Sequence, residues 1–225
     1  MMSSTDRRPA PFDTSKPTVI DPLMKRAIAE ARQFGAGPVA TVRCQGAPRF
    51  RTQLARDLGC LFDVDPDVEA WECLPGAVTL AGTTGKRRRH VPDFRVSRSD
   101  GSTVLMDTIP ASGSKGGIAG LHAIDLLDER YEQASEVDIR TEPRLSNARE
   151  LLRYAGVQVS LSDRIRFLAM LDEYGPTPIS ECLRGCRGST DPIAMIAVLT
   201  LRRFIDMDLD EAPIGPETVI RRLRD

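Results

Sequence analysis

The segment at residues 90–110, HVPDFRVSRSDGSTVLMDTIP, constrains the fold of this chain more than any other. Apolar and polar residues alternate from Val91 to Val96, and the following STVLMDTI is rich in β-branched and apolar residues, so each stretch predicts a strand. Between them, Asp100 and Gly101 are residue types that tolerate the positive φ angles of a tight turn. We therefore expect an antiparallel β-hairpin.

Two carboxylates lie at matching ends of this hairpin. Asp93 stands near the start of the first strand and Asp107 near the end of the second, which brings them close together across the ladder. Carboxylate oxygens are ligands for Mg²⁺ or Mn²⁺, and a cation held in this way can orient a phosphate and activate water. The pair therefore predicts a catalytic metal site with Asp93 and Asp107 as its ligands. The alternative is structural, because aspartates also mark strand entries and turns.

Several motifs together resemble a known family. The order of PDF, a Gly-containing hairpin and an apolar strand with an acid resembles the PD-(D/E)XK nuclease core, and most of all the TnsA transposon endonucleases. FRTQLARD at 50–57, FDVDPDVEAWECLP at 62–75 and RLSNARELLRY at 144–154 resemble further segments of that family. The resemblance covers most of residues 50–225. It implies an α/β fold with a restriction-endonuclease-like core built on a mixed sheet. After residue 143, a pattern of three helices followed by a strand and a wing predicts a C-terminal winged-helix domain.

The sequence departs from the family pattern at two catalytic positions. The usual lysine two residues after the second acid is replaced by Ile109, which carries no charge and donates no hydrogen bond. The two candidate glutamate positions of the helix motif hold Arg51 and Ala55. Loss of both groups implies a catalytically degenerate core. The alternative is an active Mg²⁺- or Mn²⁺-dependent endonuclease in which Lys115, in the following glycine-rich loop, supplies the missing lysine.

A basic run lies in a predicted loop, TTGKRRRH at 83–90, that leads into the hairpin, and the run continues along the hairpin. Lysine and arginine side chains of this kind bind phosphates, although a run of charged residues can also be only a solvent-exposed surface. Because the run flanks the predicted metal face, where a DNA strand would lie, it predicts contacts to double-stranded DNA. The predicted DNA-binding residues are Lys86, Arg87, Arg88, Arg89, His90, Arg95 and Arg98.

Composition limits the remaining possibilities. The net charge of −1 over 225 residues excludes a global attraction to DNA, so any affinity must come from local patches. No apolar run approaches the length of a membrane span, and an odd number of cysteines, five, favours reduced thiols in a cytoplasmic protein. We expect a disordered leader at 1–20, a nuclease-like domain at 21–142 and a winged-helix-like domain at 143–225.

The motifs and the resemblance together predict a DNA-binding protein that acts in a transposition or gene-regulatory assembly. The resemblance to the TnsA family also implies a partner protein on the C-terminal domain. A protein-interaction adaptor without DNA affinity is the remaining alternative. The local patterns predict helices at 22–34 and from residue 52, a further helix at 118–134 and a strand at 136–142. In the helix from residue 52, Leu54, Leu58, Leu61 and Phe62 have helical spacing, which predicts a core face. In the C-terminal part the local patterns predict three helices, the first capped by Ser162, and then a strand, a tight wing and a last helix.

Overall fold

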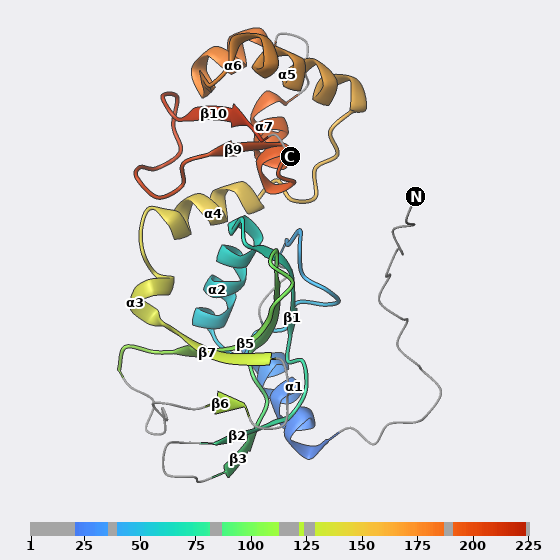
Figure 1. Ribbon diagram of the computed structural model, residues 1–225, viewed down its shortest axis with the longest axis vertical. Coiled ribbons are helices and arrows are strands. Elements are labelled where there is room, and N and C mark those ends of the chain that lie inside the picture. The colour runs from blue at the N-terminus through green and yellow to red at the C-terminus, as the bar shows by residue number, and fades with distance from the viewer. Residues whose placement is uncertain are drawn as a thin grey trace, which may run out of the picture.

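The computed structural model describes residues 21–35, 40–81, 87–112, 122–123, 129–186 and 191–223. Its helices are α1 (Pro22–Phe34), α2 (Gln53–Val64), α3 (Glu136–Ile139), α4 (Arg144–Leu152), α5 (Leu161–Tyr174), α6 (Ile179–Gly185) and α7 (Pro192–Leu201). Its strands are β1 (Val68–Cys73), β2 (Val78–Ala81), β3 (Arg87–His90), β4 (Phe94–Arg98), β5 (Thr103–Ile109), β6 (His122–Ala123), β7 (Glu129–Ser135), β8 (Thr177–Pro178), β9 (Ile205–Met207) and β10 (Val219–Arg222). Figure 1 shows this arrangement, which confirms a mixed α/β fold.

The central sheet has the strand order β1-β4-β5-β7. Strands β1, β4 and β5 are antiparallel, whereas β7 runs parallel to β5, so the sheet is mixed as predicted. The hairpin is confirmed, because Phe94 on β4 pairs with Met106 on β5 and Gly101 in the turn has a φ of 82°. A separate small sheet, in the order β3-β2-β6, lies beside the central one.

Helix α2 covers one face of the central sheet, and its apolar side chains pack against that face to form a hydrophobic core. The Thr52 side chain caps the helix by accepting a hydrogen bond from the Ala55 amide at 3.0 Å. The predicted core face is confirmed, since three of its residues are buried and Leu61 is half-buried. The aromatic part of this core consists of Phe50, Phe62, Trp71 and Phe94.

Helix α1 forms between the predicted bounds and packs beside the start of the hairpin. The Asp21 side chain accepts a hydrogen bond from the Leu23 amide at 2.8 Å, and Pro22 occupies the first turn, where its missing N–H costs nothing. Ala27 and Ala31 pack with Leu74 and Val91 in a small apolar cluster. The helix thereby lies directly beside the segment that leads into Asp93.

The segment after the hairpin differs from the sequence prediction. Residues 129–135 form strand β7 instead of the end of a helix, and residues 136–139 form helix α3 instead of a strand. The remainder of the predicted helix lies outside the described residues, apart from the short strand β6. Pairing with β5 along the whole of β7 outweighs a local preference for helix, and Ser135 then caps α3 by accepting from the Asp138 amide.

The C-terminal part contains the three predicted helices, α5, α6 and α7, and a small antiparallel sheet in the order β8-β10-β9. Helix α7 is almost entirely buried, as its apolar sequence predicts. The predicted last helix is wrong, because Val219–Arg222 form strand β10, which pairs with β8 and β9 on its two sides. The predicted cap is also wrong, since Ser160 and not Ser162 caps α5.

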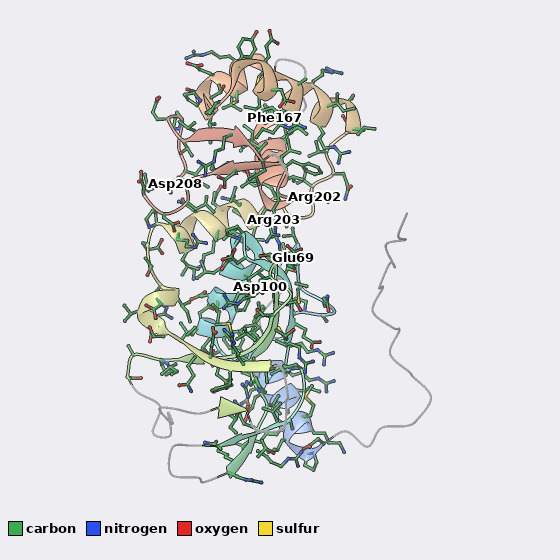
Figure 2. All side chains as sticks on the ribbon, in the orientation of Figure 1. Glu69, Asp100, Phe167, Arg202, Arg203 and Asp208 are labelled. Carbon is green, nitrogen blue, oxygen red and sulfur yellow. The ribbon has the colours of Figure 1, made fainter. Side chains whose placement is uncertain are left out.

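The two halves of the chain are joined by polar contacts. Arg203, directly after α7, donates to Glu69 on β1 at 2.8 Å and to the Asp65 carbonyl at 2.8 Å. Figure 2 shows Arg203 and Glu69 between the upper and lower halves of the molecule. Nearby, Arg149 on α4 donates to the buried Asp57 on α2 at 2.6 Å. Among the described residues, no helix is both long and apolar enough to cross a membrane.

Candidate functional site

The hairpin brings the two predicted carboxylates together. The backbone amide of Asp93 donates a hydrogen bond to Asp107 Oδ1 at 3.0 Å. Both residues are buried, with exposed fractions of 7% and 8%. The convergence follows from the register, because the adjacent residues Phe94 and Met106 are paired across the ladder. These two side chains, with those that contact them, are called the carboxylate centre below.

A guanidinium bridges the two carboxylates. Arg51 donates from Nε and Nη2 to Asp93 Oδ1, at 2.8 and 2.6 Å, and its Nη2 lies 3.4 Å from Asp107 Oδ1. Burial alone would lower the pKa of Arg51, but the charges of Asp93 and Asp107 raise it. The group is therefore a permanent cation at the position where a metal shared by the two carboxylates would lie.

The other carboxylate oxygens of the centre are also engaged. His90 Nε2 lies 2.6 Å from Asp107 Oδ2, and the Tyr131 hydroxyl donates to the same oxygen at 2.7 Å. Asp93 Oδ2 accepts from the amide and the hydroxyl of Thr108, both at 3.1 Å. Burial acts to raise the pKa of Asp107, but the hydrogen bonds from His90 and Tyr131 and the charge of Arg51 lower it.

The donor set, as arranged, does not fit a divalent cation. Among the described residues there is no group of three or more His, Cys, Asp or Glu side chains that could hold a metal. The face shared by Asp93 and Asp107 is already compensated by Arg51. Magnesium and manganese prefer several oxygen ligands, so either ion could bind here only if Arg51 moved away.

The predicted DNA-binding residues fall into two groups. Arg87, Arg88 and Arg89 are exposed on β3, a strand where the sequence predicts a loop. Arg89 pairs with Asp21, whereas Arg87 and Arg88 have no acidic partner among the described residues. Because His90 ends the same strand within the carboxylate centre, the exposed arginines lie directly beside that centre.

The second group of predicted DNA-binding residues is held by acids on other strands of the central sheet. Arg95 donates to Glu72 at 2.8 Å, and Arg98 donates to Glu132 at 3.1 Å. Both residues lie on β4 and have fewer donors available for phosphate than the arginines of β3. The predicted Lys86 and the candidate catalytic Lys115 lie outside the described residues.

Sequence reasoning missed two parts of the centre. Tyr131 was not found because its segment was predicted as a helix, whereas on β7 it reaches Asp107. Arg51 was identified only as a replacement for glutamate, and its bridging role depends on contacts across 42 and 56 positions of the chain. The available signal was chemical, since a buried pair of acids requires a compensating cation.

Comparisons with known proteins leave the family open. No family model matches the chain, and a search of curated proteins gave no match.

Proposed function

We propose that the protein binds double-stranded DNA without cutting it, through a catalytically degenerate core of the TnsA-like, restriction-endonuclease-like type. The observation that carries this proposal is the guanidinium of Arg51 between Asp93 and Asp107. Hydrolysis of a phosphodiester by this class of enzyme requires a cation that also acts as a Lewis acid on water and phosphate. Arginine compensates the charge of the carboxylates but cannot coordinate water.

A second feature supports the loss of catalysis. Ile109, which takes the position of the usual lysine, ends strand β5 in register with Ser135 on β7. Its side chain offers no donor to an attacking water or to a developing negative charge. An active enzyme would therefore need both displacement of Arg51 and a lysine from elsewhere, for which Lys115 is the candidate.

Binding to DNA is supported by the exposed arginines of β3. Arg87 and Arg88 provide cations without acidic partners among the described residues, on a strand that ends at the carboxylate centre. Because the overall charge of the chain is only −1, any attraction to the phosphates of DNA must come from a local excess of positive charge such as this one. In the C-terminal half, three helices and a three-stranded antiparallel sheet are the elements that a winged-helix domain requires.

A partner protein in a transposition or gene-regulatory assembly is supported by an apolar groove in that C-terminal half. The groove has a volume of about 540 Å³ and lies between α4, α6 and α7. It is lined mainly by apolar side chains, among them Leu151, Leu183, Ile193 and Ile196. Exposed apolar surface of this kind marks interaction sites, and it also favours the adaptor as the second candidate function.

The proposal is tested by binding to a labelled duplex at two salt concentrations with Mn²⁺ present, followed by a denaturing gel. We expect intact strands and an affinity that falls steeply with salt, because phosphate contacts release counterions. The double variant Arg87→Glu, Arg88→Glu should lose most of the binding. The double variant Arg166→Glu, Arg184→Glu, which makes the same four-unit charge change at exposed residues of α5 and α6, serves as the control.

The other outcomes separate the alternatives. Strand cleavage that depends on Mn²⁺ and is lost in Asp93→Ala would replace the proposal with an active endonuclease. Absence of binding at low salt would leave the adaptor. Binding that persists unchanged in the Arg87→Glu, Arg88→Glu variant would show that β3 is not the contact surface.

A further inference from the structure

A small basic pocket lies between α1 and β3, beside the carboxylate centre. It has a volume of about 190 Å³, and its charged lining consists of Arg26, Arg51, Arg88 and Arg89 against the single acid Glu30. His90 also lines it. The pocket is smaller than the 300–1,000 Å³ typical of sites for drug-sized ligands, so it suits a small anion and not a nucleobase with its sugar.

The arginines of this pocket retain hydrogen-bond donors. A guanidinium has five N–H donors, and those of Arg26 and Arg51 are only partly used. Arg26 donates from Nε to Glu30, and Arg51 donates from Nε and Nη2 to the carboxylate centre. Arg88 makes no ion pair among the described residues. Donors from α1, from the segment before α2 and from β3 thus converge on one cavity.

Arg51 belongs to both the pocket and the carboxylate centre. Its side chain is largely buried, with 17% of its surface exposed, whereas Arg26 is 78% exposed. Asp93 and Asp107 hold Arg51 in a fixed orientation, so little conformational entropy remains to be lost when an anion binds. Arg51 thereby offers its remaining N–H donors to the pocket in a fixed orientation.

We propose that this pocket binds a phosphate monoester, the terminal phosphate of a DNA strand. A monoester carries about −1.5 to −2 charge at neutral pH and three acceptor oxygens, compared with −1 for an internal diester. It can therefore use more of the guanidinium donors that the paired acids Glu30, Asp21, Asp93 and Asp107 leave free. The inference deepens the proposed function and rests on it, because the exposed arginines of β3 would hold the adjoining backbone. Free nucleotides and inorganic phosphate share the same chemistry.

The test compares duplexes that carry phosphates at their 5′ ends, at their 3′ ends, or at neither end. We expect one phosphorylated form to bind at least about tenfold more tightly, equivalent to about 1.4 kcal/mol. Arg88→Ala should abolish this difference, because Arg88 lines the pocket. Arg87→Ala should weaken all three duplexes equally, because Arg87 lies on the same strand but does not line the pocket.

A second measurement identifies the source of the phosphate. Inorganic phosphate and a mononucleotide are titrated at constant ionic strength, and the thermal unfolding midpoint is recorded for the wild type, Arg88→Ala and the control Lys25→Ala. Lys25 is an exposed cation of α1 that does not line the pocket. We expect the midpoint to rise in the wild type and in Lys25→Ala but not in Arg88→Ala.

Each contrary result has a separate meaning. Equal affinity for phosphorylated and unphosphorylated duplexes would overturn the pocket inference and leave DNA binding intact. A second result is that no duplex binds, but phosphate still raises the unfolding midpoint of the wild type and not of Arg88→Ala. This result would overturn both the proposed function and the inference that the ligand is the end of a DNA strand. The pocket would then be a site for free phosphate monoesters. An equal rise of the midpoint in all three proteins would exclude the pocket as the phosphate site.

Discussion

Replacement of Arg51 by methionine removes the bridging cation but keeps a side chain of similar length. Asp93 and Asp107, which are 9% and 11% exposed at the side chain, are then left as two neighbouring carboxylates without their shared cation. Breaking a buried ion pair by removing one partner typically costs about 3–5 kcal/mol. We expect Arg51→Met to lower the free energy of unfolding at pH 7 by an amount in that range.

The loss should depend on pH and on metal. As pH falls toward about 4, the ordinary range for aspartate, protonation of one carboxylate relieves the repulsion and the difference from the wild type should shrink. Arg51→Glu should add a third acid and create a group of three carboxylates that binds Mn²⁺. At a Mn²⁺ concentration of 100 times its dissociation constant, binding would raise the stability of that variant by about 2.7 kcal/mol.

Urea unfolding at several pH values, with and without Mn²⁺, measures all of these effects. Arg144→Met serves as a control, because its partner Asp210 is 62% exposed and such a pair contributes less than about 1 kcal/mol. An Arg51→Met variant as stable as the wild type would refute the view that Arg51 compensates the carboxylates. An equal response of the wild type to Mn²⁺ would refute the view that Arg51 excludes the metal.

Three further predictions concern stability and are measured by urea unfolding. Gly59→Ala should destabilise the protein by about 1–2 kcal/mol, because its Cβ would lie 2.9 Å from the buried Phe50 ring. This overpacking exceeds the gain in helix propensity from alanine. Unchanged stability would mean that the ring can shift. The pKa of Asp107 is lower in the folded protein, so its stabilising effect is present above about pH 3.9 and is lost as pH falls through the folded value. Asp107→Asn should remove this pH dependence of the unfolding free energy. A wild type that keeps its stability through that pH range would contradict the prediction. Asp57→Asn should lower the free energy of unfolding by about 1.5–3 kcal/mol, because it weakens the 2.6 Å hydrogen bond from Arg149 that joins α2 and α4. A smaller loss of stability than for Arg144→Met would argue against a stabilising contact between these helices.

The elements that were predicted correctly are those whose signals are local. Helix α1 has its cap and its first-turn proline within adjacent residues, and the hairpin has Asp100 and Gly101 between two alternating segments. The core face of α2 follows from helical spacing alone. In each case the residues that signal the element lie within a few positions of one another, so the pattern of residue types is sufficient to predict it.

The errors occur where distant pairing decides the structure. The residues of β7 have no strong strand signal, but the open edge of β5 provides hydrogen bonds along their whole length. Strand β10 likewise exists because it lies between β8 and β9. Backbone donors and acceptors must be satisfied wherever they are buried, and the nearest partner in space overrides a modest local propensity.

In the candidate site, too, the sequence predicts the parts that depend on local structure and not those that depend on tertiary packing. The residue types and the hairpin register are sufficient to bring Asp93 and Asp107 together, because both lie on one local unit. The bridge from Arg51, the hydrogen bond from Tyr131 and the pocket between α1 and β3 depend on how separate elements pack. Electrostatic interactions act through space and not along the chain, so tertiary packing alone places the guanidinium of Arg51 between the two carboxylates.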